Sequence, residues 1–208
     1  MNLTDCFTDG DSDDSNDTVG SITVPLTDDN REFIASQAGD RNASYEEGKT
    51  TNEIWGDGDS ASKHEIGFAG ELAIAGLYES ASIDTSVSAS GDGGVDTEMR
   101  IEGETRTVDV KSATYDGPGA SIMVQQDHAE RFTTVLPEVY ISCYVPDDLS
   151  CVKIRGWEYA DEVILESNLK DAPGGDWINY DVACDDLRNM VEPTGDELTE
   201  DEDYHVVR

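Results

Sequence analysis

Three side chains suited to ion binding lie in residues 91–113, which read GDGGVDTEMRIEGETRTVDVKSA. Asp109 and Lys111 are two residues apart in an apolar alternation, so on a strand they share one face. A turn at Glu102 and Gly103 predicts a hairpin that brings Asp96 to the same end. Two carboxylates and an ammonium there suit a hard divalent cation, with the lysine placed to hold a water or a charged oxygen.

An acidic residue two positions before a lysine occurs twice, as Glu47 with Lys49 and as Asp109 with Lys111. About one such pair is expected by chance in so acidic a chain. Context separates the two, because the first lies in a polar segment beside glycine and the second lies on the predicted strand. The alternative for Lys111 is an ion pair between neighbouring strands, which contributes little at high salt.

Residues 65–78, EIGFAGELAIAGLY, form the clearest predicted helix, and its apolar surface predicts that it is largely buried. Glu71 is its one charge between Ile66 and Tyr78. A lone carboxylate is costly to bury unless a cation or hydrogen-bond donors meet it, so Glu71 is a further candidate for the ion site. The alternatives are a narrow solvent-facing stripe or a structural hydrogen bond.

The remaining pattern predicts an α+β (mixed α/β) fold, a central mixed sheet flanked by helices. Residues 29–192 form the predicted domain, between acidic tails at 1–28 and 193–208. Thr27 begins a predicted helix that continues to about Ala38, and the polar residues 39–63 predict a long loop or a lid. Further strands are predicted at residues 121–126, 139–145, 151–157 and 177–182, and further helices at 159–167 and 183–192.

The chain has 47 acidic and 13 basic residues, a formal net charge of −34 and 37% hydrophobic residues. Such a composition is typical of proteins that work in molar salt, where repulsion among carboxylates is screened within roughly 3 Å. It therefore indicates an extremely halophilic archaeal cell or a virus of one. Disorder and mimicry of DNA are the rival interpretations, and the apolar periodic segments argue against disorder throughout the chain.

Four cysteines form no C-x-x-C pair and no zinc-binding spacing, so buried free thiols are expected. No apolar run reaches the ~18 residues that a membrane span needs, and the acidic N-terminus lacks the features of a secretory signal. The expected location is cytoplasmic.

Glu71 in a helical GELA segment, Asp96 entering one strand and Asp109-Val110-Lys111 on the next resemble the PD-(D/E)XK nuclease superfamily. Val95 stands where the motif has its proline. The resemblance spans about residues 30–192 and implies a restriction-endonuclease-like fold and a metal-dependent hydrolase that cleaves DNA.

The resemblance also implies roles for single residues. Asp96 and Asp109 would bind Mg²⁺ (or Mn²⁺) together with the Val110 carbonyl, and Glu71 would bind a second ion or a metal-bound water. Lys111 would orient or deprotonate the attacking water, or offset charge on the phosphate. The candidates for contact with the scissile phosphate or the lysine are Gln125 and Gln126.

DNA binders usually carry a basic face, which this chain lacks. At molar salt counterion release contributes little, so binding would depend on metal bridging, hydrogen bonds and a few arginines. The candidate arginines are Arg41, Arg100, Arg106 and Arg131. The alternative function is a catalytically inactive nuclease fold or an acidic interaction protein that mimics DNA.

Overall fold

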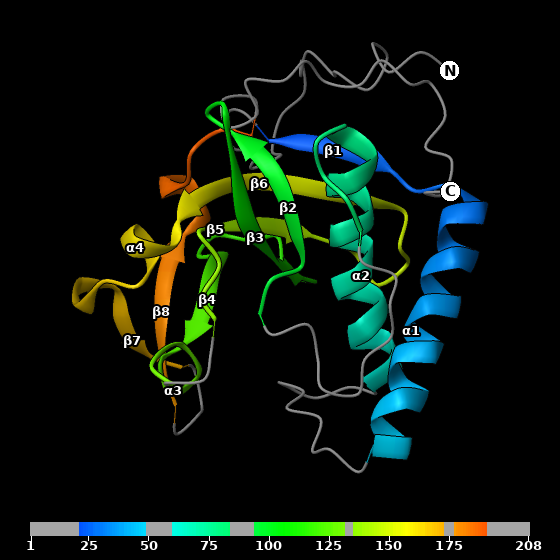
Figure 1. The fold of residues 1–208 in the computed structure, drawn as a ribbon, viewed down its shortest axis with the longest axis horizontal. Coiled ribbons are helices and arrows are strands. Elements are labelled where there is room, and N and C mark those ends of the chain that lie inside the picture. The colour runs from blue at the N-terminus through cyan, green and yellow to red at the C-terminus, as the bar shows by residue number, and fades with distance from the viewer. Residues whose placement is uncertain (1–20, 49–59, 84–93, 132–134, 173–176, 191–208) are drawn as a thin grey trace.

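The chain forms a mixed α+β fold with two sheets and four α-helices among the residues that the computed structural model describes, 21–48, 60–83, 94–131, 135–172 and 177–190 (Figure 1). The α-helices are α1 (Asp28–Gly48), α2 (Ser60–Leu77), α3 (Gln126–Ala129) and α4 (Ala160–Val163). The strands are β1 (Ile22–Pro25), β2 (Thr97–Ile101), β3 (Glu104–Ala113), β4 (Ser121–Gln125), β5 (Val139–Tyr144), β6 (Cys151–Tyr159), β7 (Leu169–Asp171) and β8 (Ile178–Ala183). Two short 3₁₀ helices are η2 (Glu166–Asn168) and η3 (Cys184–Asp186).

A mixed five-stranded sheet has the order β1-β6-β5-β3-β2, in which only the β3–β5 pair is parallel. Helices α1 and α2 lie on one side of this sheet (Figure 1). At Gly70 of α2 the helix approaches β3 so closely that an added Cβ would collide with the Ser112 hydroxyl and touch Val110. Val108 and Val110 of β3 are buried in the core formed with this helix.

The opposite face of the five-stranded sheet packs against a second sheet of order β4-β8-β7. Tyr140 of β5 lies in the core between them, with Ile122 and Val124 of β4 and Tyr180 of β8. Burial alternates along β4 because Ile122 and Val124 face this core while Met123 is half exposed. The predicted central mixed sheet therefore has helices on one face and a small sheet on the other.

The predicted hairpin is confirmed as the β2–β3 pair, with Thr97 opposite Val108 and Ile101 opposite Glu104. Its turn has positive φ at both central positions, 51° at Glu102 and 83° at Gly103. A two-residue turn of this kind matches the twist of the paired strands, and glycine adopts the left-handed conformation at little cost.

The first helix begins as predicted, with a reciprocal cap. The Asn30 amide N–H donates to the Thr27 hydroxyl, and the Thr27 amide donates to the Asn30 side-chain oxygen. The prediction of a loop over residues 39–63 is wrong for both ends of that segment, because α1 continues to Gly48 and α2 begins at Ser60. Residues 49–59 lie outside the described part of the chain. A contact between the two helices, described below, explains why α1 extends.

The prediction of a terminal helix over residues 183–192 is also wrong. Within the described residues 183–190 only η3 is helical, and Arg188 forms an antiparallel bridge to Trp157 of β6. The Trp157 indole donates to the Asn189 carbonyl and the Tyr78 hydroxyl donates to the Met190 carbonyl. These partners hold the segment extended, so tertiary contacts override its helical pattern.

Residues 22–25, within the predicted N-terminal tail, form β1 and pair with β6. Residues 1–20 and the predicted C-terminal tail, 193–208, lie outside the described part of the chain. No helix among the described residues is long and apolar enough to cross a membrane.

Candidate metal and phosphate site

Strand β3 presents Asp109 and Lys111 on the same face, as the alternation predicts. The Lys111 Nζ lies 2.6 Å from Asp109 Oδ2. Asp109 is directly beside Tyr140 in the parallel β3–β5 pairing, and the Lys111 ammonium lies 5.7 Å from the centre of the Tyr140 ring. The Asp109 side chain is 11% exposed and that of Lys111 is 37% exposed, so the lysine extends from a buried partner toward solvent.

Asp96 joins this pair at the edge of the sheet where the pairing of β2 ends. Its amide donates to the Val108 carbonyl at 2.9 Å, and its carboxylate accepts a 2.6 Å hydrogen bond from the Val110 amide. The side chain of Asp96 thus occupies the position where another strand residue would pair. This contact fixes one carboxylate beside the backbone that separates Asp109 from Lys111.

The direction of the β3 peptide groups places a third oxygen at this edge. The carbonyls of Thr107 and Ala113 accept hydrogen bonds from Glu138 and Val145, which flank β5. The Val108 carbonyl instead accepts from Asp96, and peptide directions alternate along a strand. The Val110 carbonyl is therefore directed toward the same edge as Asp96.

These oxygens are the donors that Mg²⁺ and Mn²⁺ prefer, so the residues present fit the expected ion. No cluster of three or more His, Cys, Asp or Glu side chains that could hold a metal occurs in the described part of the chain. The donor set offered at the hairpin is two carboxylates and one backbone carbonyl, which leaves coordination positions for water and a phosphate oxygen.

Glu71 has a different partner from the one expected. The Arg41 guanidinium of α1 donates to both oxygens of Glu71, at 3.1 and 3.0 Å, and lies 4.9 Å from the centre of the Phe68 ring. Helix α2 packs on the Val108 and Val110 face of β3, opposite to the face of Asp109 and Lys111. The cation that a buried Glu71 requires is thus supplied by Arg41, a residue that the sequence offered only as a DNA contact.

The two candidate glutamines have separate environments. Gln126 of α3 donates its side-chain amide to Glu130, and the Tyr180 hydroxyl donates to the same carboxylate oxygen. These two hydrogen bonds, the one from Gln126 first, lower the pKa of Glu130. The Gln125 Oε1 at the end of β4 is buried and accepts no hydrogen bond from the described residues. Gln126 therefore belongs to a local network, and neither glutamine is joined to Lys111 by a described hydrogen bond.

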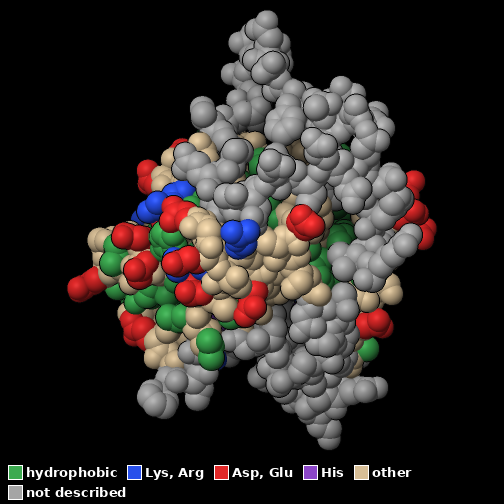
Figure 2. All heavy atoms as spheres, turned by 45° about the horizontal axis from the view of Figure 1, so that its top comes forward, with side chains coloured by type: hydrophobic (Ala, Val, Ile, Leu, Met, Phe, Trp, Pro, Cys, Tyr) green, Lys and Arg blue, Asp and Glu red, His purple; other side chains and the backbone are tan. Residues whose placement is uncertain are grey.

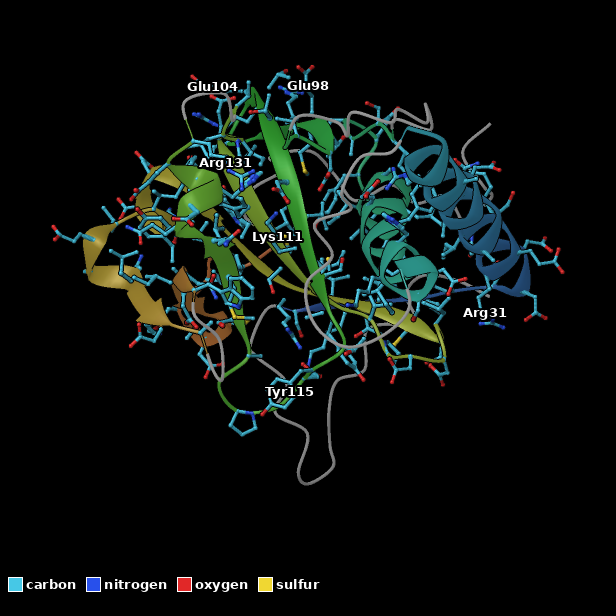
Figure 3. All side chains as sticks on the ribbon, turned by 90° about the horizontal axis from the view of Figure 1, so that it is seen from below. Arg31, Glu98, Glu104, Lys111, Tyr115 and Arg131 are labelled. Atoms are coloured by element: carbon cyan, nitrogen blue, oxygen red, sulfur yellow. The ribbon has the colours of Figure 1, made fainter. Side chains whose placement is uncertain are left out.

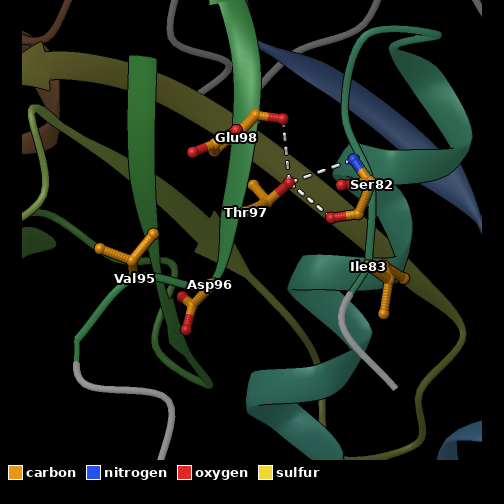
Figure 4. Close-up of a pocket in the computed structure, with 6 residues that line it drawn as sticks. All are labelled: Ser82, Ile83, Val95, Asp96, Thr97 and Glu98. Atoms are coloured by element: carbon orange, nitrogen blue, oxygen red, sulfur yellow. Dashed lines mark hydrogen bonds between the residues drawn. The ribbon is translucent and has the colours of Figure 1, made fainter. Parts of the chain in front are cut away.

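An open pocket borders the Asp96 side of the site. It is lined by Ser82, Ile83, Val95, Asp96, Thr97 and Glu98 (Figure 4). The Thr97 hydroxyl donates to the Ser82 carbonyl and accepts from the Ser82 amide, which ties the segment after α2 to the start of β2. The pocket therefore has a fixed wall next to one of the two site carboxylates.

The candidate arginines are not equivalent. Arg106 is held by Glu104 at 2.6 Å and Glu138 at 3.3 Å, and it stacks on Tyr159. Arg131 follows α3, and in Figure 3 it is drawn with Lys111 between α3 and the β2–β3 hairpin. On the face drawn in Figure 2, carboxylates outnumber Lys and Arg side chains among the described residues.

Two contacts of the site were not predicted, those of Arg41 and of Tyr140. Tyr140 lies in an apolar strand whose register against β3 no local pattern reveals.

Comparisons of the chain with protein-family models, with curated proteins and with solved structures found no match. The resemblance to PD-(D/E)XK nucleases stays an interpretation of the motif residues.

Proposed function

We propose that this chain is a metal-dependent nuclease that hydrolyses phosphodiester bonds of DNA with Mg²⁺ or Mn²⁺. The observation that carries the proposal is the hydrogen bond from the Val110 amide to Asp96, which fixes a second carboxylate beside the Asp109 and Lys111 pair. A buried structural ion pair would need only Asp109 and Lys111. Counted over the described residues at this edge, Asp96, Asp109 and Lys111 carry two negative charges and one positive charge, a balance that suits a divalent cation.

Asp96, Asp109 and the Val110 carbonyl would hold the ion. When bound, the ion supplies Lewis-acid activation of water and neutralises charge on the phosphate. Lys111, which extends from Asp109 toward solvent, would bind the attacking water or a phosphate oxygen. Glu71 pairs with Arg41 on the side of β3 opposite to Asp109, so its role as a ligand of a second ion stays a prediction that this single-ion proposal does not use.

The strong acidity of the chain sets the conditions in which it would act on DNA. In dilute buffer a net charge of −34 repels a polyanion, whereas at molar salt the repulsion is screened within roughly 3 Å. We therefore expect cleavage to need high KCl as well as the divalent ion, the opposite of the salt response of basic DNA binders.

The test uses supercoiled plasmid in about 3 M KCl, a concentration at which surface charges are screened, with Mg²⁺ or Mn²⁺. Asp109→Ala and Lys111→Ala should abolish nicking. Lys170→Ala is the matched control, because Lys170 forms a 2.8 Å ion pair with Asp181 on the smaller sheet. Unchanged cleavage by both site variants would exclude this site, and a folded wild-type chain that cleaves no DNA with either ion would favour the interaction protein.

A further inference from the structure

Among the described residues, two neighbours of different chemistry contact Lys111. Its ammonium is 2.6 Å from Asp109 Oδ2 and 5.7 Å from the centre of the Tyr140 ring, within the range of a cation–π interaction. Asp109 and Tyr140 are side by side because they are partners in the parallel β3–β5 register. The ion pair and the ring therefore direct the same flexible side chain to one place.

The two contacts respond differently to a bound cation. A carboxylate that ligates a divalent ion holds a nearby ammonium less well, because its charge is shared with the metal. A lysine held less firmly by this carboxylate regains rotamer entropy and is less well positioned. A neutral ring does not ligate Mg²⁺, so its contact with Lys111 survives.

We propose that Tyr140 is a positioning residue that keeps Lys111 over the site while Asp109 ligates the metal. This inference rests on the proposed nuclease function. It assigns to Tyr140 no contact with substrate, and its effect on the reaction passes through Lys111.

The ring is well fixed for this role. Tyr140 is 1% exposed and packs in the cluster of Ile122, Val124 and Tyr180 between the two sheets. The packed ring therefore stays in one place, with the Lys111 ammonium over it.

The same strand carries a second aromatic residue stacked on a cation, which provides a control. Tyr144 lies four residues further along β5, and the Arg155 guanidinium is 5.4 Å from the centre of its ring. Removal of the Tyr144 ring deletes a cation–π contact of similar geometry without touching Lys111.

The kinetic test compares Tyr140→Phe, Tyr140→Leu and Tyr144→Leu with the wild type, at saturating Mg²⁺ and high KCl. We expect Tyr140→Leu to lower kcat by about 3- to 30-fold with KM for DNA unchanged, the size of one cation–π contact. Tyr140→Phe should retain kcat within about 2-fold, because the ring face remains. Equal losses in the Phe and Leu variants, or a loss as large in Tyr144→Leu, would overturn the proposal.

A second measurement needs no catalysis and no variant that must fold. In the wild-type chain the ring current of Tyr140 should shift the Lys111 side-chain methylene proton signals upfield, and the shift should persist when Mg²⁺ is added. Return of these signals to ordinary lysine positions with Mg²⁺ would overturn the positioning role. A persistent shift in a chain that cleaves no DNA would instead reject the nuclease function and leave the contact itself established.

Discussion

The carboxylate of Asp96 takes the place of a strand at the edge of β3, where it accepts a 2.6 Å hydrogen bond from the Val110 amide. One side chain thus has two duties. It satisfies a backbone donor that the end of β2 leaves without a strand partner, and it adds negative charge beside Asp109. Asparagine can accept the hydrogen bond from Val110 but carries no negative charge. Substitutions of Asp96 can therefore separate its contribution to the fold from its contribution to ion binding.

The Asp96→Asn variant should fold like the wild type but bind the divalent ion more weakly. The amide oxygen still accepts from Val110, so the free energy of unfolding should change by less than about 1 kcal/mol. Loss of one of two ligand charges should weaken Mn²⁺ binding at least about tenfold, measured by titration calorimetry in high KCl. Asp96→Ala should weaken binding as much and also cost about 1–2 kcal/mol of stability, because the Val110 amide loses its acceptor. Mn²⁺ affinity that is equal in wild type and Asp96→Asn would contradict the ligand role.

Arg41→Ala should destabilise the chain by about 2–4 kcal/mol, because it removes the guanidinium that donates to both oxygens of the buried Glu71 carboxylate. This range is below that of a fully buried pair, since the Arg41 side chain is 21% exposed. The measurement is urea denaturation at constant KCl. Arg41→Met combined with Glu71→Leu should recover most of the loss, because apolar replacement of both partners removes the unpaired charge. A double variant less stable than Arg41→Ala would mean that Glu71 has a further essential partner.

The hairpin and the placement of Asp109 beside Lys111 were predictable because both depend on local signals. A glycine in a two-residue turn fixes the register, and a period of two fixes which side chains share a face. For Glu71 the structure shows one of the stated alternatives, a structural hydrogen bond to a cationic partner, since a buried carboxylate requires a donor or a cation. The identity of this partner was not predictable, because Arg41 is 30 residues away and α1 had to extend beyond its predicted end to bring it there.

The errors have a common physical cause. The segment after Cys184 has a helical pattern, but Arg188 exchanges backbone hydrogen bonds with Trp157 in β6 and the segment is held extended. In the same way, β4 reads as a strand that follows β3, yet it pairs with β8 in a separate sheet. Partners distant in sequence decide both cases, and hydrophobic periodicity carries no information about which partner a strand selects.

The free energy of unfolding should rise with KCl. A formal charge of −34 destabilises the compact state by self-repulsion, and the repulsion is screened as the Debye length falls from about 10 Å at 0.1 M salt to about 3 Å at 1 M. Circular dichroism during KCl titration at constant temperature measures the effect, with tetramethylammonium chloride as a second salt to separate screening from specific ion binding. A folded fraction that is independent of both salts would contradict the halophilic interpretation.

His64 should make stability fall on mild acidification. Burial, and then the nearby Arg41 charge, lower the pKa of His64 from its usual 6.5. The unfolded chain therefore binds more protons than the folded chain in the window just below pH 6.5, so the free energy of unfolding decreases as pH falls through that value. His64→Gln should reduce the difference in stability between about pH 7.5 and about pH 5.5, measured by urea denaturation. His128→Gln on α3 is the control, and an equal effect of both variants would assign the pH dependence to other groups.

Asp116 should contribute more to stability than its exposure suggests, because it is the carboxylate for two buried cations. Its oxygens lie 2.8 Å from Arg155 Nη2 and 3.5 Å from Lys153 Nζ, and these basic residues are 3% and 8% exposed. Asp116→Ala leaves both charges without this partner and should cost about 2–4 kcal/mol, reduced from the fully buried case because Asp116 is one-third exposed. Asp181→Ala removes the partner of the exposed Lys170 and should cost less than about 1 kcal/mol.

Urea denaturation at constant KCl compares the two variants. High salt should reduce the stability cost of Asp181→Ala more than that of Asp116→Ala, because buried charges are screened less. Equal stability costs for the two variants would show that water solvates Lys153 and Arg155 once the Asp116 carboxylate is removed.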